Sequence, residues 1–274
     1  MELGPLNFTI MIITEEQEYR AHPALNFSSG KHLLKSQKHF LAEKSAKFEP
    51  SREMVIGTFV HAQILEGIRP PYAIKPEGMS FVTKEGKAWR DANAGVEILT
   101  ESESLTINRT IDAIRANKDV MYLLDRCPNR EQGIITKYRG VEIKARLDAH
   151  GMDEAQARII CDLKTTGDAN PETWGAHAAK LGYFAQMAFY KTALAMETGI
   201  DYTPSWVWIV AETNAAADVV IYRPPAEAVE IGQRQLDIII DRYLDLMETG
   251  VPKGYPSGLI DLEVPRWMSR KYLD

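Results

Sequence analysis

The sequence predicts an α/β fold in which helices flank a central mixed β-sheet. Apolar and polar residues alternate over residues 141–148, which is typical of a strand with one buried face. Apolar residues recur at helical spacing over residues 171–198 and 226–249. Because helices and strands follow one another along the chain, we expect helices on the faces of one sheet, in a single domain over residues 1–274.

Helices are expected to dominate the first half of the chain. A basic helix should begin at Ser28 or Ser29, either of which suits an N-cap, and a second helix should cover residues 54–66. Thr100 and Glu103 have the spacing of a capping box, which predicts a helix from about residue 100 to 124. Residues 69–100 are rich in proline, glycine and charge, so we expect a loop or flap there.

The second half of the chain should supply most of the sheet. A turn through residues 151–154 separates two strand-like segments, so these are expected to pair as a hairpin. Gly199 should end the long helix that follows, and Gly250 should end the closing helix. The expected strands cover residues 141–148, 158–164, 206–211 and 218–222.

The net charge and the cysteine spacing argue against several classes of function. Lys and Arg number 32 against 38 Asp and Glu, so the net charge of −6 does not indicate a nucleic-acid-binding protein, and any such site would be a local patch. The two cysteines, Cys127 and Cys161, lack a C-x-x-C spacing, which argues against a cysteine-bound zinc or iron–sulfur cluster. Two unpaired cysteines suit a reducing compartment.

No membrane segment is expected. The longest apolar runs, at residues 7–13 and 206–211, are far shorter than the ~20 residues that span a bilayer. The first residues also lack the basic start and apolar core of a secretory signal, because Glu2 is acidic and further acids follow. We therefore expect a cytoplasmic protein.

One local patch of positive charge stands out. Lysines outnumber acids five to one between residues 31 and 47, and Lys31, Lys35 and Lys38 are the candidates for contact with DNA phosphates. The alternative is a solvated amphipathic helix, and the sequence leaves both open.

A group of charged residues on the predicted hairpin can do chemistry. Side chains alternate along a strand, so Asp162 and Lys164 share a face, and Asp148 at the end of the paired strand can meet them. Carboxylates of this kind suit Mg²⁺ beside a phosphate, and the lysine can orient water or offset charge at phosphorus. A D-x-K segment is ordinarily a surface ion pair, but the apolar run over residues 159–161 places this one on a mostly buried strand.

Four motifs in order give a resemblance to a known family. They are the helix segment GTFVH ending at His61, ARLD ending at Asp148, DLKTT beginning at Asp162, and QMAFY from Gln186 to Tyr190. This set resembles the PD-(D/E)XK nuclease superfamily in its RecB-like branch. Over roughly residues 20–270 the chain more closely resembles the RecE exonuclease family of phages and prophages.

The resemblance implies roles for individual residues. His61, Asp148, Asp162 and the Leu163 carbonyl would bind Mg²⁺, with Mn²⁺ as a substitute, and Lys164 would be the catalytic lysine. Gln186 and Tyr190 would lie beside the scissile phosphate. Their spacing of four residues independently puts both on one face of a helix.

The resemblance also implies an activity and partners. The protein would be a Mg²⁺-dependent exonuclease that degrades one strand of duplex DNA from an end in the 5′ to 3′ direction, leaving a 3′ overhang for a RecT-like single-strand annealing protein. Because the net charge is negative, we expect retention of the DNA by a closed ring of three or four copies. The alternatives are an endonuclease, an exonuclease of different direction, and a non-catalytic DNA-end-binding recombination protein.

Three further residues near these motifs keep open roles. Arg146 could pair with a carboxylate or contact a DNA phosphate. Glu66 could help to position His61 or face solvent, and it is left out of the predicted site. Glu131 could contact the metal or a water molecule, but the sequence does not place it.

Overall fold

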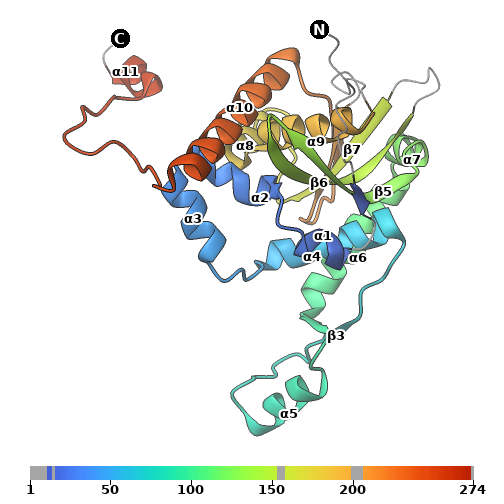
Figure 1. Cartoon of the computed structure of the whole chain (residues 1–274). Helices are drawn as coiled ribbons and strands as arrows, with labels where there is room; N and C mark the ends of the chain where they lie inside the picture. Colours follow the sequence, from blue (N-terminus) through green and yellow to red (C-terminus); the bar gives the residue numbers. More distant parts are fainter. Residues whose placement is uncertain (1–10, 14–15, 153–157, 199–205, 273–274) are drawn as a thin grey trace.

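A mixed seven-stranded sheet forms the centre of the molecule in the computed structural model, which describes residues 11–13, 16–152, 158–198 and 206–272. The strands lie in the order β1, β5, β6, β7, β8 and β9, with β2 beside β6. The predicted fold class, a mixed sheet flanked by helices, is confirmed (Figure 1). Within the described residues, no helix has both the length and the apolar character needed to cross a membrane.

The expected hairpin is present as β6 and β7, which pair antiparallel. An additional strand, β5, precedes the hairpin and pairs antiparallel with β6, and it was not among the strands expected from the sequence. The chain then crosses over to β8, which is parallel to β7, and returns through β9. The strand bounds are β1 Met11–Ile13, β2 Leu25–Asn26, β5 Asn129–Tyr138, β6 Val141–Met152, β7 Arg158–Thr166, β8 Trp206–Glu212 and β9 Val219–Tyr222.

Two apolar cores lie on opposite faces of this sheet. One contains buried side chains of α9 (Tyr183–Thr198) and α10 (Ala226–Thr249) against the sheet. The other contains side chains of α4 (Arg52–His61), α6 (Glu101–Ala116) and α7 (Lys118–Asp125). Figure 1 shows α9 and α10 on one side of β6, with α4 and α6 on the other. The sheet is therefore covered on both faces, and its central strands are buried.

The basic segment is not one helix. It forms α2 (Phe27–Gly30), a 3₁₀ turn η1 (Lys31–Leu34) and α3 (Gln37–Ser45). The N-cap of α2 is Asn26, whose Oδ1 accepts the Ser29 N–H at 2.8 Å, so the prediction of Ser28 or Ser29 as N-cap was wrong by two or three residues. Ser36 then caps α3 through the His39 N–H, which restarts the chain in a new direction.

Two of the expected helices differ from the prediction at their ends. The second helix starts at Arg52 after the N-cap Ser51, and its last residues form a π-helical turn, η2 (Ala62–Glu66). The capping box of Thr100 and Glu103 is confirmed. That helix is nevertheless divided into α6 and α7 at Asn117, because the Asn117 side chain accepts the Val120 N–H and caps a new helix.

The expected long helix over residues 171–198 is two helices. Gly182 adopts a left-handed conformation with φ 78°, which favours glycine and ends α8 (Trp174–Leu181). Gln186 therefore lies in the first turn of α9 rather than in the middle of a long helix. The closing helix has the expected bounds and ends at Gly250. Of the expected turn over residues 151–154, the first two residues belong to β6, whereas residues 153–154 and Gly199 fall outside the described residues.

Residues 69–100 contain regular structure, so the prediction of a loop was wrong in part. Two short strands, β3 (Tyr72–Ile74) and β4 (Glu97–Leu99), pair in parallel, and α5 (Lys84–Ala92) connects them. Figure 1 shows α5 standing away from the body of the molecule. Only Gly86 and Leu99 are buried among residues 69–100, so no hydrophobic periodicity marked these elements in the sequence.

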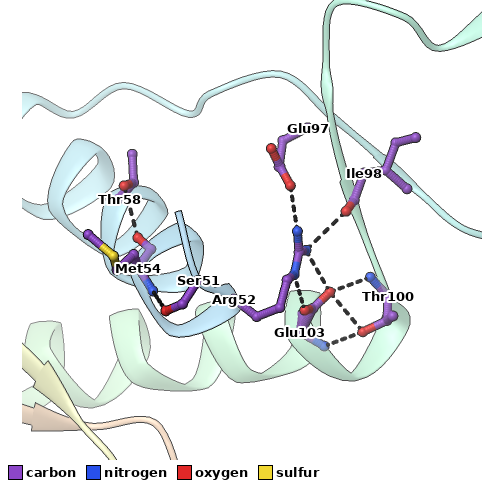
Figure 2. Close-up of polar contacts among 8 residues, drawn as sticks. All are labelled: Ser51, Arg52, Met54, Thr58, Glu97, Ile98, Thr100 and Glu103. Atoms are coloured by element: carbon purple, nitrogen blue, oxygen red, sulfur yellow. Dashed lines mark hydrogen bonds and ion pairs between the residues drawn. The ribbon is translucent and has the colours of Figure 1, made fainter. Parts of the chain in front are cut away.

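Arg52 joins this projecting unit to the body (Figure 2). Its Nε lies 2.7 Å from Glu103 Oε1, its Nη1 lies 2.7 Å from Glu97 Oε1, and its Nη2 donates to the Ile98 carbonyl at 3.0 Å. One guanidinium thus links the first turns of α4 and α6 to β4. The same helix α4 carries His61 at its other end.

The C-terminal segment leaves the body and ends in α11 (Arg266–Tyr272), as Figure 1 shows. Leu259 and Leu262 are almost completely exposed, at 100% and 94%, and Trp267 is 64% exposed. Exposed apolar side chains in one segment are typical of a surface that another chain covers.

Glu103→Ala should lower the free energy of unfolding by about 1–2 kcal/mol at pH 7, because it removes both the capping box and the partner of Arg52. The hydrogen bond from Arg52 lowers the pKa of Glu103 from 4.5 to about 2. The stabilisation is therefore complete above pH 4.5 and disappears as the pH falls toward 2. Urea unfolding at pH 7 and at pH 3.5 measures both effects.

Glu101→Ala is the matched control, since it lies in the same helical turn outside the capping box. An equal loss of stability in both variants would contradict the assignment.

Candidate active site

A close approach between α4 and the sheet positions His61. A Cβ atom at Gly57 would lie 2.9 Å from Thr165 Oγ1 on β7, so a larger residue would push the helix away from the strand. His61 follows Gly57 by one helical turn and lies on the same face of α4. The motif GTFVH therefore combines a contact that requires glycine with an imidazole directed at the sheet.

The strands β6 and β7 separate where their carboxylates lie. Their backbone pairing runs from Met152↔Arg158 to Ala149↔Cys161 and then stops. The next N–H on β7 that needs an acceptor is that of Leu163, and Asp148 Oδ2 accepts it at 2.8 Å. The Asp148 side chain thus fills the place of a backbone carbonyl at the opening between the strands.

Glu131 enters the same region from β5. The pairing of β5 with β6 includes Arg130↔Ala149 and Gln132↔Leu147 but omits Glu131, which lies opposite Asp148. Glu131 has φ 47°, a left-handed conformation that costs a non-glycine residue of the order of 1 kcal/mol. Its Oε2 accepts a hydrogen bond from Arg146 Nε at 2.7 Å.

Three potential metal ligands converge at this point. His61 Nδ1 lies 3.8 Å from Asp148 Oδ2 and 3.8 Å from Glu131 Oε1, and the three residues offer ligand atoms within 4.8 Å of one another. These separations exceed hydrogen-bond distance. Oxygen and imidazole ligands about 2.1 Å from a Mg²⁺ ion lie about 3–4 Å from one another, so the residues present fit a divalent cation.

Asp162 and Lys164 form an ion pair next to this cluster. Lys164 Nζ lies 2.6 Å from Asp162 Oδ2, and the Asp162 side chain is only 2% exposed. The ammonium also lies 4.8 Å from the centre of the Tyr183 ring at the start of α9. The expected shared face of Asp162 and Lys164 is present, although Asp162 is not one of the three convergent ligands.

Gln186 and Tyr190 lie one turn apart on α9. Burial raises the pKa of Tyr190 well above its ordinary value, a hydrogen bond from Gln186 opposes the shift, and the charges of Asp162 and Asp148 add to it. Tyr190 therefore experiences the field of both carboxylates. The spacing of four residues puts both side chains on one face of this helix, which follows the D-x-K strand.

Opposing effects set the protonation of the cluster. Burial raises the pKa of Asp148 to about 7; His61 opposes this shift, and Asp162 reinforces it. Burial alone would lower the pKa values of His61 and Lys164, but the neighbouring carboxylates outweigh it and raise both. Burial would raise the pKa of Glu131, yet His61 and Arg146 hold it below its ordinary value.

The predicted DNA-binding lysines are exposed but lie outside this cluster. All three are exposed, Lys31 on η1, Lys35 directly after η1 and Lys38 on α3. The segment packs against the acidic helix α10, where Arg242 Nη1 donates to the carbonyls of Leu33 and Leu34. The acidic helix α10 is thus next to the basic segment.

Glu131 is the residue that sequence reasoning left without a position. The strand that carries it has adjacent buried residues, Ile134 and Ile135, and so lacks the alternation that marks a strand. The structure also resolves the two options for Arg146, which pairs with the Glu131 carboxylate.

The comparisons agree with this arrangement. Residues 26–263 match the family described as "PDDEXK-like domain of unknown function (DUF3799)". The crystal structure of a protein from Eubacterium rectale, named "Putative exonuclease", is similar with a TM-score of 0.61 at 12% sequence identity. The similarity covers 95% of this chain and 98% of the other, and at this identity it concerns the fold. No protein of curated function matches the sequence.

Asp148→Asn should stabilise the metal-free protein at pH 8 by about 1–3 kcal/mol and have little effect near pH 4. The folded protein keeps a proton on Asp148 up to about pH 7, whereas the ordinary pKa is 3.8, so wild-type stability falls as the pH rises between these values. Urea unfolding in EDTA across this range gives the difference. The exposed Asp112→Asn is the control, and a pH-independent effect of Asp148→Asn would contradict the prediction.

Proposed function

We propose that this chain, which belongs to the family of PDDEXK-like domains, is a Mg²⁺-dependent exonuclease of PD-(D/E)XK type that acts on duplex DNA ends. The observation that carries the proposal is the convergence of His61, Glu131 and Asp148 beside the Asp162–Lys164 pair. Hydrolysis of a phosphodiester by a metal-dependent enzyme needs side chains that bind a cation and a positive group that stabilises charge on the phosphate.

Each residue has a task in this reaction. A divalent cation, when bound, supplies charge that stabilises the attacking and leaving oxygens. His61, Asp148 and Asp162 are the ligands we propose for it, with the Leu163 carbonyl. Lys164 stabilises negative charge on the phosphate, and its ion pair with Asp162 keeps it charged and directed.

Gln186 and Tyr190 are proposed to contact the same phosphate. Phosphate oxygens accept hydrogen bonds, and the Gln186 amide N–H and the Tyr190 hydroxyl, one turn apart on α9, are the groups that could donate to them. Amide and phenol groups on the first turns of α9 suit the orientation of a phosphate beside Lys164.

Attack from DNA ends is supported by the similar Eubacterium rectale protein, which is named "Putative exonuclease". The 5′ to 3′ direction and the 3′ overhang for an annealing protein follow from the resemblance to the RecE family. A non-catalytic DNA-end-binding protein is a weaker proposal, because Asp148, Asp162 and Lys164 are all present and partnered.

We further propose that DNA is held by a local basic track within a ring of three or four copies. The exposed lysines of η1 and α3 supply positive charge on an acidic protein. The projecting C-terminal segment, with Leu259 and Leu262 exposed, suits contact with a neighbouring copy. Light scattering of the purified chain tests the number of copies.

Asp162→Asn should abolish nuclease activity, because it removes a charge that both the cation and Lys164 need, and circular dichroism checks that the variant folds. The assay is a time course on linear duplex labelled at the 5′ or the 3′ end, beside a closed circle, in Mg²⁺ or EDTA. The wild-type protein should release 5′ label first, spare the circle and require Mg²⁺. Cleavage of the circle would establish an endonuclease, and a variant that cuts at the wild-type rate would refute the site.

Lys35→Glu combined with Lys38→Glu should weaken binding to duplex DNA, since each lost phosphate contact lowers the slope of log affinity against log salt by about one. Titration at several salt concentrations in Ca²⁺ measures the slope. Lys118→Glu with Lys137→Glu, both exposed elsewhere, has the same charge change and should retain the wild-type slope. Equal behaviour of the two double variants would mean that the basic segment is only solvated.

A further inference from the structure

The two carboxylate oxygens of Glu131 have different environments. Oε2 accepts the hydrogen bond from Arg146 Nε at 2.7 Å, which fixes the plane and direction of the carboxylate. Oε1 lies 3.8 Å from His61 Nδ1, a separation too long for a hydrogen bond. One oxygen is therefore anchored, and the other is directed at the cluster with His61 and Asp148.

The backbone places Glu131 there at an energetic cost. Its φ of 47° is left-handed, and the β5–β6 ladder omits it while pairing the residues on either side. An ordinary strand residue at this position would have kept the backbone pairing. With the pairing interrupted, the carboxylate of Glu131 lies near that of Asp148 and accepts the hydrogen bond from Arg146.

Simple ion pairing with Arg146 does not account for this arrangement. Both side chains are about 15% exposed, so a carboxylate bound only to Arg146 would have gained a bidentate contact by turning its second oxygen to the guanidinium. That oxygen instead lies with His61 Nδ1 and Asp148 Oδ2 at the spacing of ligands around one cation.

We propose that Glu131 is a direct ligand of the cation bound by His61 and Asp148, and that Arg146 is a positioning residue that holds its other oxygen. The inference rests on the proposed function, because it adds to the cation site of that reaction. It extends the ligand set predicted from the sequence by one carboxylate and gives Arg146 a task within the site.

The test is Mn²⁺ binding to the full chain without DNA, followed through the electron paramagnetic resonance signal of free Mn²⁺. Glu131→Gln keeps the volume but removes the charge, and it should raise the dissociation constant at least about tenfold. Arg146→Gln should raise it by a smaller factor, because it frees the carboxylate without removing it, and Arg146→Lys should restore part of the affinity. Circular dichroism and melting temperature establish that the variants fold.

Glu66→Gln is the matched control. Glu66 is an acid on the turn after His61 and its charge reaches Glu131, but it is not one of the convergent ligands, so its dissociation constant should stay within about twofold of wild type. Glu131→Asp decides the matter should the Gln variant not fold. It keeps the charge and withdraws the carboxylate by one methylene group, and it should also weaken Mn²⁺ binding.

The outcomes separate the inference from the proposed function. A wild-type protein that binds Mn²⁺ and cuts DNA, with folded Glu131 variants of unchanged affinity, would overturn the inference alone. A wild-type protein that binds Mn²⁺ through Glu131 but cuts no DNA would uphold the inference and overturn the proposed function. A wild-type protein with no Mn²⁺ affinity would overturn both.

Discussion

The remainder of the structure depends on one constraint: each carboxylate buried at the centre of the sheet must have a cationic partner. Three carboxylates meet in a partly buried region, where an unpaired charge is strongly unfavourable. Each has its own cationic neighbour, and the pairs come from different elements. The pairs are Asp148 with His61, Asp162 with Lys164, and Glu131 with Arg146. The register of β5, β6 and β7, and the position of α4 above them, must therefore all be satisfied at once.

The elements with a clear period could be predicted from the sequence. The alternation from Val141 onward predicted the hairpin, although β6 runs four residues beyond its expected end at residue 148, and the apolar helical stripe of α10 predicted the bounds of the closing helix. The D-x-K pair could be predicted for the same reason, because side chains two apart on a strand share a face whatever the tertiary structure. The prediction of His61, Asp148 and Gln186 as site residues depended on the order of four motifs along the chain, because no single pattern identified them.

What could not be predicted depends on tertiary contacts or on single residues. Gly182 divides one helical stripe into two helices, and periodicity alone does not show that division. Glu131 acquires its place through a left-handed backbone and an interrupted ladder, neither of which has a signature in residue type. Residues 69–100 fold with scarcely any buried side chain of their own, so no hydrophobic pattern was there to be found.

This last feature has a consequence for how stability is distributed over the chain. Between residues 69 and 98 only Gly86 is buried, and the ring stack of Phe81 on Trp89 is the main apolar contact that α5 makes. A unit with so little buried surface opens at a free energy far below that of global unfolding. The amide hydrogens of residues 69–98 should exchange with solvent while the sheet is intact. Local opening is therefore expected mainly in this unit, which the ion pairs of Arg52 with Glu97 and Glu103 join to the body.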